Sequence, residues 1–565
     1  ELDVINAQQN IKKFLFESID WLENCDNCLK FRSKAFKSSN LAIEDDIRIL
    51  EDNIAYLTEQ IDKYSESNGN KKNQWMVDFL NQALQEEKEL NSNLSDQIIE
   101  NAQNVIRRDS SIIMNTTMGQ KEIAETAMKE NSRIIEKVSD NQLMLSYINA
   151  GPMVGYSEKS EVALWIQTKK TSKVKFIYWD INNLNNILET EEITTNKESG
   201  FTATLIADLV KPGTTYYYQP IIDNQKIEFD YKLEFQTQEH WEYRTPPPNF
   251  SFAVGSCAYT NEIEKDRPGK SYGGDYFIYS NILEKDPDFM LWLGDNVYFR
   301  EPDASRTGVY HRYSHDRALK ELQPLLGSVH HYAIWDDHDY GPNNSDRSFI
   351  HKNITLQAFK DFWANPSYGI ENNRGITTQF RWSDVDFFLL DNRFFRSPQN
   401  RQHTYKEILG KEQLEWLIDA LSASQATFKI IAIGGQVLNS EKIFENYINW
   451  EEEHTELLNL IEKEQIEGVV FLSGDRHFSE VSKMSRFNSY PLHDFTVSPL
   501  TSGFCDICVD ENNKNRIKES AVFQRNFAIF SIYSSNKDRV LDYTIFDNKG
   551  KPLWNYKINA SDLKY

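Results

Sequence analysis

The apolar residues of the first part of the chain recur with the spacing of a helix. Between Ile43 and Ile61 they step by four and three residues in turn, which is the pattern of a coiled-coil seam or of a bundle helix. No proline precedes Pro152, and the only glycines before residue 151 are Gly69 and Gly119. Because both residue types disfavour helix interiors, the pattern predicts an all-α region, a helical bundle or a coiled coil, over residues 1–145.

From residue 151 the period of the apolar pattern shortens from about 3.6 residues to two. Short runs of β-branched and aromatic residues follow, separated by turn residues, as is typical of β-strands. They occupy residues 161–168, 173–179, 201–205 and 210–219. So many short strands close together predict a small antiparallel β-sandwich over residues 150–240. Three consecutive prolines at 246–248 then predict a stiff linker.

Beyond residue 248, short apolar strands alternate with helical stretches, a pattern typical of an α/β domain. The predicted strands are residues 250–254, 289–293, 331–335, 385–390, 429–433 and 469–472, and a hairpin over 540–558 closes the chain. Functional residues of such domains lie on loops at the carboxyl ends of the strands. The sequence therefore predicts a multidomain chain whose third part, residues 248–565, carries the functional residues.

The charge balance limits the functions open to the chain. There are 62 basic and 85 acidic residues, which give a formal net charge of −23. General nucleic-acid binding is not expected, since it needs a basic surface. No stretch approaches the roughly 18 consecutive apolar residues of a membrane span, and none reads as the apolar core of a signal peptide. Because the chain opens on Glu1, we expect a processed or trimmed start, with any export signal out of view.

Four predicted strand ends carry clusters of metal-binding side chains, at residues 255–257, 294–298, 336–339 and 474–477. Each cluster alone has an ordinary explanation, as an Asx turn, a helix N-cap or a buried cysteine. Together they bring several carboxylates to one edge of the sheet, where bound cations are the simplest way to offset their repulsion. The spacing fits two metals about 3.5 to 4 Å apart, with Asp295 as the natural bridge.

The order of these clusters resembles a known family. Gly-Asp-x-x-Tyr at 294–298, Asp-Asp-His-Asp at 336–339 and Gly-Asp-x-His at 474–477 resemble the calcineurin-like metallophosphoesterases, specifically the alkaline phosphatase D (PhoD-like) branch. Residues 151–218 resemble the fibronectin-like amino-terminal domain of that branch, and residues 498–503 are also similar to it. The resemblance covers about 150–555 and implies an α/β metallophosphoesterase sandwich of two sheets flanked by helices. Residues 1–145 have no counterpart in it.

The resemblance also implies a ligand set for a first metal ion. The superfamily's usual first motif, Asp-x-His, is replaced here by Gly-Ser-Cys ending at Cys257, as in the PhoD-like branch. Carried over by motif, Cys257, Asp295, Tyr298 and Asp475 would bind Fe³⁺. Thiolate and phenolate are strong anionic donors that suit a trivalent ion.

A second cation is implied beside the first. Asp295 would bridge to it, and Asp337 and His477 would complete its ligands, with Asp336 as a further candidate. In this branch the second cation is expected to be Ca²⁺, and another divalent cation also fits carboxylate ligands. His338, next to the metals in sequence, is the candidate for protonating the leaving group or orienting the phosphate.

Further candidates follow the later strands. The superfamily often supplies another histidine ligand where this chain has Gln436 and Asn439, so either amide is a candidate neutral ligand. Arg300, Arg393 and Arg476 follow the motifs, and arginine suits bidentate contact with phosphate. Arg393 is the first choice, because its strand is predicted to end at the same edge, although exposed arginines are common without such a role.

The cysteines allow more than one arrangement. Cys25 and Cys28 form one Cys-x-x-Cys pair, Cys505 and Cys508 form another, and Cys257 is left over. No spacing supports a four-cysteine zinc site. Buried thiols are the simplest explanation of the first pair, while in an exported protein local disulfides or a link between the two pairs are also open.

The sequence thus favours a metal-dependent phosphoric ester hydrolase, an alkaline phosphatase or phosphodiesterase that activates water for in-line attack on a small phosphate ester. We expect it to be exported, to the periplasm, the cell surface or the exterior, with the helical region serving oligomerisation or anchoring. One alternative is a hydrolase of another ester on the same metal scaffold. The other is an interaction or anchoring protein with an inactive phosphatase-like domain, which ranks lower because all four clusters keep their ligands.

Overall fold

The computed structural model describes residues 145–370, 374–535 and 538–565, which belong to a compact unit that spans Lys137–Tyr565. The predicted helices of residues 1–145 and the Cys25–Cys28 pair lie outside the described residues. In the described part, no helix combines the length and the apolar character that crossing a membrane requires.

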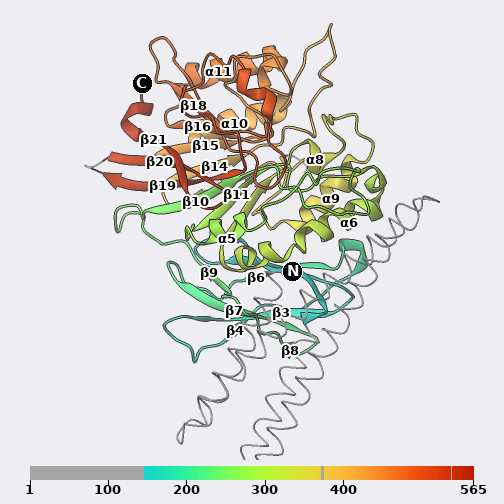
Figure 1. Cartoon of the computed structure of the whole chain (residues 1–565). Helices are drawn as coiled ribbons and strands as arrows, with labels where there is room; N and C mark the ends of the chain where they lie inside the picture. Colours follow the sequence, from blue (N-terminus) through green and yellow to red (C-terminus); the bar gives the residue numbers. More distant parts are fainter. Residues whose placement is uncertain (1–144, 371–373, 536–537) are drawn as a thin grey trace, which may run out of the picture. The chain divides into compact units, whose positions relative to one another are not determined.

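A nine-stranded sheet forms one layer, with the strand order β21-β20-β19-β10-β11-β12-β1-β2-β6 (Figure 1). Its centre, β10-β11-β12, is parallel, and the neighbours on the β19 side are antiparallel. The strands are β1 Ile148–Ser157, β2 Val162–Thr168, β6 Thr202–Ala207, β10 Phe250–Gly255, β11 Phe289–Leu293, β12 His330–Ile334, β19 Asn526–Ser535, β20 Asp538–Asp547 and β21 Pro552–Asn559.

A six-stranded sheet, β13-β14-β15-β16-β18-β17, forms the second layer. Its four inner strands are parallel and its two edge strands are antiparallel. The strands are β13 Thr378–Trp382, β14 Val385–Leu389, β15 Phe428–Ala432, β16 Val469–Ser473, β17 Glu480–Met484 and β18 Leu492–Thr496. Mixed sheets with parallel centres agree with the predicted α/β phosphoesterase sandwich.

Aromatic side chains fill the space between the two sheets. The rings of Phe252 and Phe289, on adjacent strands of the first sheet, are stacked with centroids 4.9 Å apart. Phe387 of β14 meets both rings edge-on, with centroids 5.3 Å away in each case. Such edge-to-face contacts add to the free energy gained by burying the rings, so this aromatic core fixes one sheet against the other.

Helices cover the outer faces, as the alternation of side chains along each strand requires. Phe388, which points away from Phe387, meets Trp416 of α10, and Trp292 of β11 meets Tyr279 of α5. The helices are α5 Ile278–Leu283, α6 Arg306–Arg317, α7 Gln323–Ser328, α8 Asp337–Tyr340, α9 Lys352–Phe362, α10 Lys411–Ala423 and α11 Glu451–Lys463.

The predicted β-sandwich is joined to the rest through a common sheet. A third sheet contains β3 Lys173–Asp180, β4 Leu188–Glu189, β5 Ile193–Thr194, β7 Thr215–Ile222, β8 Gln225–Lys226 and β9 Glu234–Gln236. It shares an apolar core with β1, β2 and β6, and β1 pairs with β12 through Val154 and His330. The residues predicted as a separate sandwich therefore contribute three strands to the nine-stranded sheet.

A buried ion pair connects the two large sheets. Arg539 of β20 donates to both carboxylate oxygens of Asp384, in the turn between β13 and β14, at 2.6 and 3.1 Å. The same guanidinium binds the carbonyl of Pro248 and the side chain of Asn249, and so holds the predicted linker. Both members of the pair are buried, so each charge depends on the other.

Replacing Arg539 by alanine should strongly destabilise the fold, because the carboxylate of Asp384 would stay buried without its partner. We expect Arg539→Ala to lower the free energy of unfolding by about 3–5 kcal/mol, measured by urea titration with far-UV circular dichroism. Lys411→Ala is the matched control, since Lys411 forms an exposed pair with Glu415 at 3.7 Å, and its loss should cost no more than about 1 kcal/mol. Equal losses would show that burial of the first pair does not matter.

Candidate metal centre

Sharp backbone turns at the strand ends bring the predicted ligands together. Cys257, Asp295, Asp475 and His477 all have positive φ angles, of 59°, 52°, 64° and 57°. Residues other than glycine rarely adopt this left-handed conformation, and such strained residues cluster at functional sites. The strain lets each chain segment turn immediately after β10, β11 or β16 and direct its side chain to a common point.

The first group of ligand atoms lies around Asp295. Three potential ligand atoms, one each from Cys257, Asp295 and His477, all lie within 4.8 Å of one another. The hydroxyl of Tyr298 is 3.2 Å from Oδ2 of Asp295 and 3.2 Å from Nε2 of His477. These four side chains surround one small volume, as a metal site requires.

His477 is oriented for binding through its Nε2 atom. Its Nδ1 lies 2.6 Å from the carbonyl oxygen of Gly503, which can only accept, so the network assigns the ring proton to Nδ1. The lone pair of the neutral ring is then on Nε2, which faces the group around Asp295. Metal-binding histidines are commonly fixed in this way by a carbonyl group behind the ring.

Two further groups continue from the first. Asp295, Asp337 and His338 form one, and Asp336, Asp337 and Asp475 form the other, each with ligand atoms within 4.8 Å. Asp295 belongs to the first and second groups and Asp337 to the second and third, so each group shares a residue with the next. Asp295 therefore has the position of the predicted bridge.

Asp475 and His477, which the resemblance assigned to different cations, also fall in different ligand groups. The resemblance implied His477 for the second cation and Asp475 for the first. In the structure, His477 lies with Cys257 and Tyr298, while Asp475 lies with Asp336 and Asp337. The reason is that residues 475 and 477 both have left-handed backbone, so the alternation expected of an extended segment does not apply.

The electrostatics of the described residues fit bound cations. Burial, together with the charges of Asp337 and Cys257, raises the pKa of Asp295 well above its usual range. Burial and neighbouring carboxylates raise the pKa of Asp336 and of Asp475 to about 7. One carboxylate oxygen of Asp336 and one of Asp337 are buried without a hydrogen-bond partner. A cation would reverse these shifts and satisfy those oxygens.

Arg393 supports the acidic cluster from behind. It is fully buried, it binds Asp336, and it donates two hydrogen bonds to Glu445 at 2.6 and 3.1 Å. Its guanidinium is enclosed and its donors are used by these carboxylates. Contact between Arg393 and phosphate stays a prediction. Glu445, which also binds Arg396, was not found from the sequence, because it follows no strand end.

The other predicted arginines are also engaged in the structure. Arg300 is buried and binds Asp266 and the backbone carbonyls of Tyr298 and Thr260. It therefore secures the turn that carries Tyr298, and its guanidinium is not directed at the cluster of carboxylates.

Gln436 and Asn439, the candidate neutral ligands, form a polar support around Arg476. Gln436 donates to Glu480 at 2.7 Å, and its oxygen accepts from Asn439 and from Arg476. The oxygen of Asn439 accepts from a backbone amide two residues later. Arg476 is further bound to Glu511 at 2.5 Å. Both amide oxygens therefore accept hydrogen bonds within this support, and coordination of a metal by either residue stays a prediction.

Several residues that the sequence did not single out individually complete the site. The hydroxyl of Tyr272 lies 3.0 Å from Nδ1 of His477. Ser498 accepts from the His477 amide at 3.0 Å and donates to Sγ of Cys257 at 3.1 Å. The similarity of residues 498–503 to the family was the only signal for Ser498, and Tyr272 had none.

The cysteines of the described part are now assigned. Cys505 and Cys508 form a local disulfide, and Cys257 is a free, buried thiol. Of the arrangements left open for the second Cys-x-x-Cys pair, the structure shows the local disulfide. The leftover thiol is the one in the ligand group.

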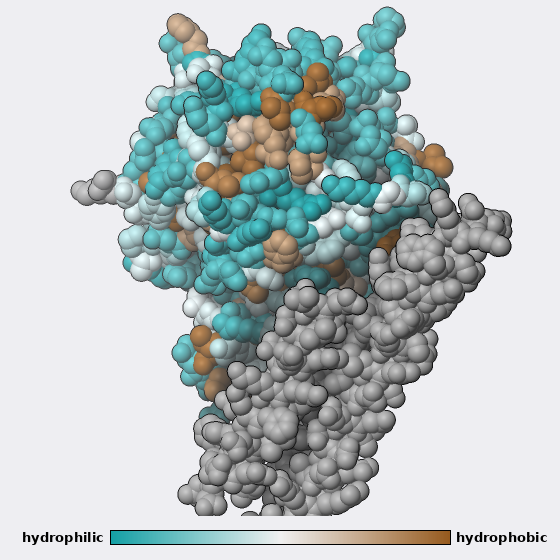
Figure 2. Space-filling model, viewed as in Figure 1, coloured by the Kyte–Doolittle hydropathy of each residue, from teal (hydrophilic) through white to brown (hydrophobic). Residues whose placement is uncertain are grey.

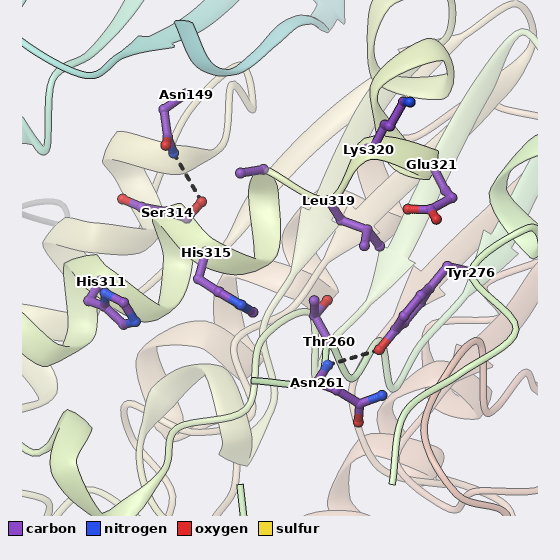
Figure 3. A pocket seen from close by; sticks show the side chains of 11 residues that line it. Asn149, Thr260, Asn261, Tyr276, His311, Ser314, His315, Leu319, Lys320 and Glu321 are labelled. Atoms are coloured by element: carbon purple, nitrogen blue, oxygen red, sulfur yellow. Dashed lines mark hydrogen bonds between the residues drawn. The ribbon is translucent and has the colours of Figure 1, made fainter. Parts of the chain in front are cut away.

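A separate cavity of about 580 Å³ lies beside α6 (Figure 3). Its lining includes His311, His315 and Leu319. Opposite them lie Asn261 and Tyr276, and the backbone N–H of Asn261 donates a hydrogen bond of 2.8 Å to the hydroxyl of Tyr276. None of the residues lining this cavity belongs to the ligand groups, so the two features are distinct.

Comparison with known proteins supports the relation suggested by the motifs. Residues 252–531 match the family of PhoD-like phosphatases. Alkaline phosphatase D of Bacillus subtilis (strain 168) is 20% identical over an alignment of 336 residues. The alignment covers 49% of this chain and 53% of the relative, so the chain spans about half the length of that curated relative.

Two solved structures share the fold of the described part. The structure of PhoD aligns with a TM-score of 0.60 at 16% identity and covers 74% of this chain and 92% of its own. Purple acid phosphatase PPD1 from yellow lupin (Lupinus luteus) seeds aligns with a TM-score of 0.53 at 11% identity, covering 72% and 74%. The family match assigns residues 252–531 of this chain to the PhoD-like phosphatase family, and the two structures show the fold that this part of the chain shares with them.

Proposed function

We propose that this chain is a metal-dependent phosphoric ester hydrolase, an alkaline phosphatase or phosphodiesterase, with a dinuclear centre. The observation that carries the proposal is the overlap of three ligand groups through Asp295 and Asp337. The first group contains a thiol and a histidine and has the phenol of Tyr298 beside it, whereas the third group consists of carboxylates. We propose that the first group binds Fe³⁺ and that the third binds Ca²⁺ or another divalent cation.

The side chains around the proposed dinuclear centre have different roles in ester cleavage. A pair of cations bound there would make a water molecule nucleophilic near neutral pH and would neutralise the charge of the phosphate. Asp295, Asp337 and Asp475 would hold these cations, and Arg393 keeps Asp336 in position. His338 is only partly buried and packs on the ring of Tyr298 with centroids 4.3 Å apart. It is the residue proposed to give a proton to the leaving oxygen.

Export to an oxidising compartment is part of the proposal. The disulfide between Cys505 and Cys508 supports it, because disulfides persist in periplasmic and extracellular proteins and are rare in reducing compartments. The predicted role of residues 1–145 in oligomerisation or anchoring remains a prediction, since these residues lie outside the described part.

Metal analysis tests the dinuclear centre. We expect the purified protein to contain iron and a second cation, and to absorb in the visible through a phenolate bound to Fe³⁺. Tyr298→Phe should lose that absorption, whereas Tyr259→Phe, a change in a tyrosine that binds Asp266 instead, should keep it. Asp295→Asn should lower kcat/KM for p-nitrophenyl phosphate by more than about 100-fold, the upper range for residues that only support a ligand.

Metal analysis and two activity assays of the same purified protein could also exclude the proposal. If the protein holds no iron and hydrolyses neither p-nitrophenyl phosphate nor the bis ester when iron and calcium are supplied, the hydrolase function is excluded.

The proposed role of His338 predicts a dependence on the leaving group. His338→Asn should lower kcat for an alkyl phosphate by about 100-fold or more, the usual range for a general acid. The loss should be smaller for p-nitrophenyl phosphate, because that leaving group departs without a proton. His311→Asn, in the separate cavity, is the control and should leave both rates unchanged. Equal losses on the two esters would instead assign His338 to phosphate binding.

A further inference from the structure

A short loop closed by the disulfide is attached to the metal centre at both ends. This disulfide loop, residues 503–511, begins at Gly503, whose carbonyl accepts from Nδ1 of His477, and the amide of Cys505 donates to the His477 carbonyl at 2.9 Å. It ends at Glu511, which binds Arg476 at 2.5 Å. The loop is therefore held on the same turn that carries the ligand His477.

The disulfide loop displays apolar side chains to solvent. Phe504 is 49% exposed, Ile507 is 77% exposed and Val509 is 54% exposed, while Cys508 between them is buried. The described surface otherwise is largely hydrophilic, with a few apolar patches (Figure 2). Clustered exposed apolar groups on a folded chain commonly mark a binding surface.

Two further exposed aromatic side chains, Tyr272 and Phe444, lie on segments that contact the disulfide loop or Arg476. Tyr272 is partly exposed, and its ring lies against Gly503, where an added Cβ atom would be 2.8 Å from it. Phe444 is also exposed and lies under the guanidinium of Arg476. Tyr272, Phe444, Phe504, Ile507 and Val509 thus form an apolar rim, the name used below for these five residues, on segments that contact His477 and Arg476.

The rim is pre-organised for binding. The disulfide and the contacts at both ends fix the loop before any ligand arrives, so that less conformational entropy is lost on binding. Apolar side chains stabilise a fold when they are buried. The exposed phenylalanine and isoleucine of this loop therefore add no stability to the fold, and binding explains their presence better.

The charges beside the rim restrict what it can bind. Asp506 and Asp510 are exposed on the same loop, and residues 503–511 contain no lysine or arginine. The guanidinium groups beside the rim are already paired with carboxylates: Arg476 with Glu511, Arg516 with Glu480 and Arg525 with Asp275. A ligand with a negative charge at this position would be repelled without compensation.

We propose that the apolar rim binds the leaving group, and that the chain selects phosphate esters whose leaving group is apolar and uncharged. The phosphate would lie at the ligand groups and the apolar part on the disulfide loop, because the loop begins directly at His477. This inference rests on the proposed hydrolase function and assigns its substrate class.

The test compares aryl phosphates with leaving groups of differing polarity. For the metal-loaded full chain we expect kcat/KM to be highest for 2-naphthyl phosphate, lower for phenyl phosphate and lowest for 4-carboxyphenyl phosphate. Ile507→Ser combined with Val509→Ser should lower the ratio of the naphthyl to the carboxyphenyl value by about tenfold, the effect expected for removing a few methylene contacts. Ile187→Ser, which changes another exposed isoleucine, next to β4, should leave the ratio as in the wild type.

A second variant tests the contribution of the disulfide. Cys505→Ser combined with Cys508→Ser should lower the same ratio by loosening the loop, with an unchanged melting curve as evidence that the rest of the chain is folded. An unchanged ratio in both double variants would overturn the inference.

The possible failures can be told apart. If the metal-loaded chain hydrolyses none of the three esters, the hydrolase function itself fails. If it hydrolyses all three with no preference, only the rim inference fails. In a third outcome, the wild type binds phosphatidylcholine vesicles in a sedimentation assay, and the two double variants lose this binding but keep the wild-type ratio. The rim then contacts a lipid surface, and the leaving-group inference is again overturned.

Discussion

The repulsion between carboxylates that the fold forces together governs this structure. Asp295, Asp336, Asp337 and Asp475 lie near one another at the end of parallel strands, largely shielded from water. In such surroundings a group of negative charges is costly unless positive charge is close. Arg393 supplies part of it, held between Asp336 and Glu445, but the unpartnered oxygens of Asp336 and Asp337 show that the protein's own groups do not supply all of it. The strained turns, the buried arginine and the orientation of His477 follow from keeping these charges in place.

Much of the architecture could be predicted from the sequence because its signals are local. Continuous apolar runs such as residues 289–293 and 469–472 coincide with β11 and β16, since strands buried on both faces carry no polar side chains. The strand β18, Leu492–Thr496, was missed because His493 and Asp494 interrupt its apolar run, although both are buried in the sheet. The strand β1 was missed because Gly151, Pro152 and Gly155 read as turn residues.

The candidate site was predictable as a set of residues but not as an arrangement. Motif spacing identifies Asp475 and His477 as a pair, whereas their assignment to different ligand groups depends on two left-handed φ angles that the spacing does not encode. Likewise, the sequence places Arg393 after a strand that ends at the right edge, but whether it faces a substrate or a carboxylate depends on Glu445, which is distant in sequence. Long-range charge partners of this kind leave no local pattern.

The described part of the chain contains a pair of oxidised cysteines and one reduced cysteine. Cys505 and Cys508 are joined by a disulfide on the surface loop, whereas Cys257 must stay reduced for its proposed role as a thiolate ligand. Thiol–disulfide exchange requires direct attack by an accessible thiolate. Cys257 is buried beneath Ser256 and Ser498, and burial raises its pKa to about 12, so the folded chain keeps it out of exchange until a metal replaces its proton. Burial of a single side chain thus allows one molecule to mature in oxidising surroundings without scrambling its cysteines.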